Sequence, residues 1–198
     1  MKSNIYWFKN LPPKSFDDNI NWKPVIPYKW LREKFMVAVY ILQFALFAIF
    51  MMYVRSYTPN YDINMQSQIY KILDYISNNK SIIYILLAVI FIIHEILHIT
   101  VIFKKWDFSI TFKYLFLWIS TNAELSKFRQ LTFTSLPLFM LTVIPFIISL
   151  FVFNDLAYII RIIAFFNLMV SSADIINSFF ILIKPNKAIF CGGMYYNL

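Results

Sequence analysis

The residues best suited to chemistry are two histidines, four positions apart, with a glutamate beside the first. They read His94-Glu95-Ile-Leu-His98 and are the only histidines among the 198 residues. Side chains at i and i+4 project from one face of a helix, so both imidazoles can reach a single ion. Neutral imidazoles are good zinc ligands, and two of them leave room for a third ligand and a water. Zinc lowers the pKa of such a water to about 7. Glu95 lies one residue from His94, near enough to take the proton of that water, so it is the expected catalytic base.

A third ligand must be an oxygen or the one cysteine sulfur, because no histidine remains. Apart from the glutamate of the motif, Asp174 is the only acid inside an apolar run. Lys104 follows His94 by ten residues, and Lys184 follows Asp174 by ten. If both segments are helices, His94 and Asp174 would each lie roughly 15 Å from the same membrane edge. Asp174 is the expected third ligand; the alternative is that its carboxylate pairs with Arg161 or a backbone group.

Polar residues form a line around Asp174. Asn167, Ser171, Asp174 and Ser178 are spaced by 4, 3 and 4, which places them on one helical face. We expect Asn167 to bind a substrate carbonyl or stabilise an oxyanion, and Ser171 to orient Asp174. The alternative is that these small polar residues only help helices to pack, as is common in membranes.

The elements that position these residues are predicted to be membrane spans. The chain is 60% hydrophobic and 14% charged, whereas a soluble domain carries about a quarter charged residues. Four apolar runs each meet the length of roughly 20 residues that a bilayer requires. They cover about residues 36–54, 81–103, 133–153 and 156–183. We expect an all-α membrane protein with about four transmembrane helices; prolines make two half-helices the alternative for the third run.

Lysine and arginine placement predicts the orientation. Seven lie in residues 1–35, five in residues 104–132 and two after the last run. The positive-inside rule then puts both termini and the 104–132 loop in the cytoplasm, with the runs in a bacterial cytoplasmic membrane. Residues 1–35 are expected to be a cytoplasmic or interfacial segment, and residues 36–198 a single transmembrane domain. The net charge of +8 is spread over loops, so we expect no nucleic-acid partner.

The loop after the motif predicts a short β-hairpin. Apolar and other residues alternate from Phe108 to Trp118, which is the period of a strand. A turn-like Ser120-Thr121-Asn122 precedes a second expected strand at 123–129. Such a hairpin at the cytoplasmic membrane face could pair with an extended substrate. The alternative is an amphipathic segment lying on the membrane.

In these residues the chain resembles the site-2-protease type of intramembrane zinc metallopeptidase. It is more similar, over about residues 80–190, to a bacterial family of zincin-like peptidases of unknown function. The shared pattern is an HExxH span, a basic stretch such as Leu125-Ser-Lys-Phe-Arg129, a Pro-containing span and an Asn…Ser…Asp helix. The resemblance implies a zinc cofactor, with His94, His98 and Asp174 as ligands and Glu95 as the catalytic glutamate. Unlike site-2 proteases, this chain has no proline between its Asn and Asp.

Together these features predict an integral membrane zinc endopeptidase. Its expected partners are the lipid bilayer and a peptide or membrane-protein substrate, cleaved within or near the membrane at the cytoplasmic face. The alternative is a non-catalytic, partner-binding or immunity-type membrane protein whose metal site is structural. Metal transport ranks last, because the first apolar run has almost no polar residue to form a path.

Overall fold

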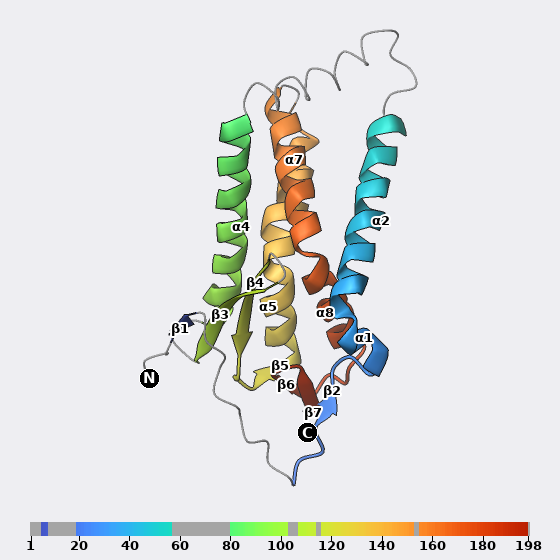
Figure 1. The fold of residues 1–198 in the computed structure, drawn as a ribbon, viewed down its shortest axis with the longest axis vertical. Helices are drawn as coiled ribbons and strands as arrows, with labels where there is room; N and C mark the ends of the chain where they lie inside the picture. The colour runs from blue at the N-terminus through green and yellow to red at the C-terminus, as the bar shows by residue number, and fades with distance from the viewer. Residues whose placement is uncertain are drawn as a thin grey trace.

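The computed structural model describes residues 5–7, 19–56, 80–102, 107–113, 116–152 and 155–197. It is mostly helical (Figure 1). The helices are α1 (Lys29–Glu33), α2 (Phe35–Ser56), α4 (Lys80–Ile102), α5 (Lys127–Leu138), α6 (Ile144–Ser149), α7 (Asp155–Val170) and α8 (Ser172–Leu182). A π-helical turn, η1 (Phe139–Val143), joins α5 to α6.

Seven short strands are found among the described residues, so the all-α prediction is corrected. One sheet has the order β1-β3-β4, in which β1 is parallel to β3 and β3 is antiparallel to β4. The other is antiparallel in the order β2-β7-β6-β5. All the strands lie at one end of the helices (Figure 1). They are β1 (Ile5–Trp7), β2 (Lys23–Pro24), β3 (Phe108–Lys113), β4 (Phe116–Thr121), β5 (Leu125–Ser126), β6 (Ala188–Cys191) and β7 (Met194–Asn197).

Two helices of the described structure are long and apolar enough to cross a membrane, Tyr84–Ile102 and Lys127–Ser149. The α7–α8 pair makes a third if it counts as one span, although it bends by 60°. The sequence predicted four spans. The part of α2 that is described in full, Phe35–Ile49, counts only as a shorter apolar helix, so four spans are not confirmed.

The expected strand at 123–129 is wrong for most of its length. Only Leu125–Ser126 pairs, with β6, and a helix begins at Lys127. Ser126 caps that helix by accepting a hydrogen bond from the backbone N–H of Arg129 at 3.5 Å. The span that follows therefore starts before the expected residue 133, and it continues through the prolines as a single candidate span, Lys127–Ser149.

A β-hairpin does form in the 104–132 loop, but its turn is misplaced by the sequence pattern. The strands end at Lys113 and restart at Phe116, so Ser120 and Thr121 belong to β4 rather than to a turn. Directly paired residues point to the same face, so Ile110 shares a face with Ile119, and the odd-numbered positions of β4 continue the face of the even-numbered positions of β3. Apolar residues occupy consecutive positions from Phe116 to Ile119, so the alternation in the sequence shows no break where the chain turns.

Two apolar clusters hold the sheets against the helix ends. One joins the end of α4 to the hairpin and α5, and contains Ile102, Phe108, Ile110, Ala123, Leu125 and Phe133. The other joins the end of α8 to the second sheet and to the residues before α2, and contains Val25, Leu31, Phe180, Ile181, Ala188 and Phe190. Burial of these side chains fixes the ends of both helices that carry the candidate ligands.

Candidate metal centre

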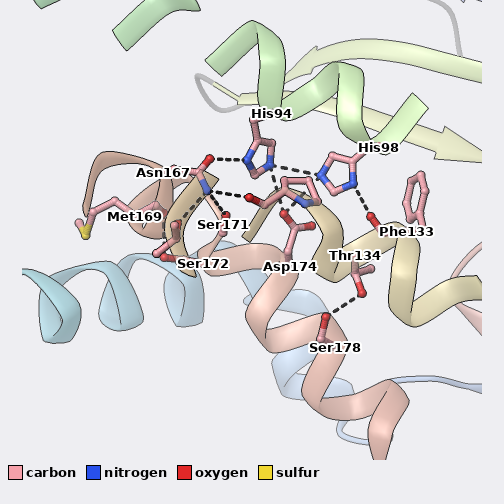
Figure 2. A network of polar contacts seen from close by, with 12 residues as sticks. His94, His98, Phe133, Thr134, Asn167, Met169, Ser171, Ser172, Asp174 and Ser178 are labelled. Atoms are coloured by element: carbon pink, nitrogen blue, oxygen red, sulfur yellow. Dashed lines mark hydrogen bonds and ion pairs between the residues drawn. The ribbon is translucent and has the colours of Figure 1, made fainter. Parts of the chain in front are cut away.

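His94, His98 and Asp174 meet between α4 and α8. The Nε2 atoms of the two rings are 3.2 Å apart, and the Oδ2 atom of Asp174 lies 3.2 Å from one and 3.3 Å from the other. Figure 2 shows the carboxylate pointing from α8 toward both rings. Both histidines are buried, and Asp174 is 16% exposed. The structure therefore brings together the three residues expected to bind zinc.

The outer nitrogen of His98 is held by the backbone of α5. Its Nδ1 atom lies 2.6 Å from the carbonyl oxygen of Phe133. A carbonyl can only accept, so Nδ1 must carry the proton and donate. In the neutral ring the lone pair is then on Nε2, the atom that faces Asp174.

The outer nitrogen of His94 is held in the same way by Asn167. Its Nδ1 atom lies 2.9 Å from Oδ1 of Asn167. The amide is not free to flip, because its Nδ2 atom donates to the carbonyl of Pro137 at 3.1 Å and to the hydroxyl of Thr142 at 2.9 Å. Oδ1 therefore accepts, Nδ1 of His94 donates, and Nε2 is again the bare nitrogen.

Three acceptors thus converge with no proton among them when both rings are neutral. Two lone pairs and a carboxylate at 3.2–3.3 Å repel one another unless a cation lies between them. Ligand atoms 2.0–2.1 Å from a tetrahedral zinc are themselves about 3.3 Å apart. The separations and the donor set fit zinc, and the three-residue set leaves the fourth position open.

Asp174 reaches the rings because the last span bends. The 60° bend falls at Ser171, between α7 and α8, and places Asp174 in the first turn of α8. There the positive end of the helix dipole favours a negative charge. The carbonyl of Met169, beside the bend, accepts hydrogen bonds from Ser172 Oγ at 2.8 Å and from Gln43 Nε2 at 3.0 Å. The bend forms without a proline because side chains satisfy its backbone.

Asn167 and Ser171 lie behind the ring of His94. Asn167 is fully buried, and its amide is engaged by His94, Pro137 and Thr142. Ser171 is also fully buried, and its hydroxyl lies 3.4 Å from Nδ2 of Asn167. Ser171 therefore contacts Asn167, and Asn167 in turn holds the ring of His94 from behind.

The other polar residues of the last span contact neighbouring helices. Ser178 lies 2.7 Å from the hydroxyl of Thr134 on α5. Arg161 donates to the hydroxyl and the carbonyl of Ser149 at 3.3 and 3.2 Å. Among the described residues, Asp174 forms ion pairs with His94 and His98 and none with Arg161.

Glu95 lies next to the ligands on the wall of a cavity of about 510 Å³. The same cavity is lined by His94, His98 and Asp174. Glu95 is half-buried and makes no hydrogen bond or ion pair with the described residues. Its carboxylate is thus placed to face a molecule that enters the cavity.

Several contacts of the site carry no sequence signal. The carbonyls of Phe133 and Pro137 belong to residues that read as ordinary apolar positions of a span. Gln43 and Thr142 were detectable as polar residues within apolar runs, although nothing in their spacing linked them to the histidines.

Fold and site together define a helical protein with apolar spans and a buried His-His-Asp group that could hold a metal ion. Residues 87–189, just over half of the chain, match the family described as "Putative zincin peptidase". The chain belongs to this family, whose name indicates a zinc-dependent metallopeptidase. No curated protein matches the chain, and no solved structure does.

Proposed function

We propose that the protein is an intramembrane zinc metallopeptidase. It hydrolyses a membrane-embedded or membrane-proximal peptide bond near the cytoplasmic face. The observation that carries this proposal is the convergence of three unprotonated acceptors, two Nε2 atoms and one Oδ2 atom, beside a glutamate that lines the same cavity. Such a group is costly inside an apolar bundle unless a cation neutralises it.

Zinc would be held by His94, His98 and Asp174, and it supplies a Lewis acid and an acidified water when bound. The carboxylate of Glu95 takes the proton of the attacking water and then gives it to the nitrogen of the leaving amine. Phe133 and Asn167 keep the two rings in the tautomer that presents Nε2. The buried ligands sit among spans, where the surrounding helices limit access by water.

Among the described residues, the β3–β4 hairpin has a free edge to which a substrate in extended form could bind. One edge of β3 is already occupied by β1, and the outer edge of β4 has no strand partner among the described residues. The end of β4, at Ile119, Ser120 and Thr121, lines the cavity that contains the ligands. A peptide added to that edge as a strand would present its backbone to the site.

Several features support the proposed topology. We propose four crossings: the candidate spans α4 and α5–α6, the bent α7–α8 pair counted as one span, and α2. Every strand, from β1 near the amino terminus to β7 near the carboxyl terminus, lies at one end of the helices (Figure 1). With the positive-inside rule, that end is proposed to be cytoplasmic, in a bacterial cytoplasmic membrane. We propose that α4, α5–α6 and α7–α8 correspond to the three-span core of site-2 proteases, with α2 as an addition.

The test compares the wild type with Glu95→Gln, both purified with their zinc content measured. We expect about one zinc per chain in each. Only the wild type should cleave a library of apolar peptides, with products identified by mass spectrometry. Cleavage by Glu95→Gln would overturn the role of this residue. A zinc-loaded wild type that cleaves nothing, and a biological phenotype unchanged by Glu95→Gln, would favour the non-catalytic alternative with a structural metal.

A further inference from the structure

One wall of the cavity comes from outside the family match. The match begins at residue 87, but several lining residues precede it. These residues lie before α1, within α1 and at the start of α2. They are Val25, Ile26, Arg32, Phe35, Met36 and Val39. Because this wall is separate from the ligand-bearing core, it is suited to distinguish substrates rather than to perform the chemistry.

Among the described residues that line the cavity, Arg32 is the only lysine or arginine. Its Nη1 atom donates to the carbonyl of Ile26 at 3.0 Å. Ile26 lines the same cavity, so this bond holds the guanidinium on the cavity wall. The bond uses one of five N–H donors, and the side chain remains exposed.

No acidic residue in the described part of the chain forms an ion pair with Arg32. The adjacent Glu33 pairs with Lys29 instead, at 3.8 Å. The acids of the cavity, Glu95 and Asp174, belong to the candidate site, and neither has a described ion pair with Arg32. The guanidinium therefore offers donors to whatever occupies the cavity. Its planar fork matches a carboxylate, which it can bind through two parallel hydrogen bonds.

We infer that Arg32 selects peptide substrates that carry a carboxylate close to the scissile bond. The carboxylate belongs either to an aspartate or glutamate side chain or to the carboxyl terminus of the peptide. This inference rests on the proposed function, because it assigns the substrate preference of the same cavity. Phe35, Met36 and Val39 on the same wall make the neighbouring surface apolar, so the preferred segment combines one acidic group with apolar residues.

The experiment uses the full-length, zinc-loaded protein in nanodiscs of neutral lipid. The probes are quenched fluorescent peptides of apolar sequence in which one aspartate is moved position by position. Each has a twin with asparagine at that position, and a further pair differs only in a free or amidated carboxyl terminus. A charge-assisted hydrogen bond contributes about 1.5–3 kcal/mol. At the favoured position we therefore expect kcat/KM to exceed that of the twin by about ten- to a hundredfold.

Variants of α1 identify the residue responsible. Arg32→Gln should bring the ratio between twins to about one, and Arg32→Glu should reverse it toward a peptide with lysine at that position. Arg32→Lys keeps the charge without the fork and should give an intermediate ratio. Lys29→Gln is the matched control, because it removes an equal charge from the same short helix but does not line the cavity. It should leave the ratio unchanged.

Failure of this inference is distinguishable from failure of the proposed function. Binding of each twin to zinc-loaded Glu95→Gln, measured by fluorescence anisotropy, reports the preference without turnover. A wild type that cleaves no peptide counts against the proposed function, whereas tighter binding of the aspartate twins still supports the role of Arg32. Equal affinity for the twins overturns it. So does an effect of Arg32→Gln that follows the anionic lipid content of the nanodisc, since the guanidinium would then bind lipid phosphate.

Discussion

The Nδ1 atom of His94 lies 2.9 Å from Oδ1 of Asn167, a contact that joins α4 to α7 in the interior of the protein. Asn167 in turn donates to Pro137 and Thr142, at the join of α5 and the π-helical turn. π-Helical turns are often found at functional sites. Here the turn carries a hydroxyl that fixes the amide behind a metal ligand.

Replacement of Asn167 by alanine is expected to weaken zinc binding by about ten- to a hundredfold, as removal of a ligand's hydrogen-bond partner typically does. The ring of His94 would lose the acceptor that fixes its tautomer. Competition with a chromogenic chelator measures the affinity. Ser178→Ala is the control, because Ser178 contacts Thr134 and not the ligands. Affinity within about threefold of wild type for Asn167→Ala would contradict this assignment.

Removal of the metal should destabilise the protein. A ligand that binds only the folded state contributes about 2.7 kcal/mol at a hundred times its Kd. Thermal unfolding in detergent should therefore shift to lower temperature after chelation and recover when zinc is restored. Asp174→Asn keeps the shape of the side chain but lacks the anionic oxygen, so it should hold well below one zinc per chain. A chelator shift of equal size in Asp174→Asn would show that the metal binds elsewhere.

Lys127 fastens the end of α8. Its Nζ atom donates to the carbonyls of Leu182 and Lys184 at 2.8 and 2.5 Å, and to Oδ1 of Asn186 at 3.3 Å. Lys127→Met keeps the apolar stem and loses all three bonds, which should lower the free energy of unfolding by about 1–2 kcal/mol. Denaturation followed by tryptophan fluorescence measures this. Lys187→Met, at an exposed position of the same region, should change it little.

Gln43 and Ser172 should act together, because both donate to the carbonyl of Met169. Either replacement alone, Gln43→Leu or Ser172→Ala, leaves that partly buried acceptor one side-chain partner. The double variant leaves it none from these side chains, so the loss of stability should exceed the sum of the single losses by about 1 kcal/mol or more. A double-mutant cycle of thermal stability tests the coupling, and simple additivity would argue against a shared acceptor.

The span of α4 and the grouping of the three candidate ligands were predicted well from the sequence. The span of α4 was expected at about 81–103 and is observed at Lys80–Ile102, because a long run that is apolar apart from one motif has few alternatives to a helix in a bilayer. The meeting of His94, His98 and Asp174 was also predicted, from their types and common depth. Burial of ionisable groups costs enough that their depth and partner are strongly restricted.

Features that depend on distant contacts escaped prediction. The bend at Ser171 needs donors from Gln43 and Ser172, and only one of them is near it in the chain. Strands β1 and β2 each have fewer than four residues and exist by pairing with β3 and β7. Segments so short carry no period of their own. The carbonyl partners of the two rings belong to backbone, which every residue possesses, so no residue type marks them.

The separation of the ligands along the chain has a consequence for how the protein is made. Asp174 is eighty residues downstream of His94, so a growing chain exposes two imidazoles long before it contains the carboxylate. The complete ligand set exists only after α8 has been synthesised and has joined α4 in the bilayer. Under the proposed function, all three ligands can therefore hold zinc only after this late packing step, and not while the chain contains α4 alone.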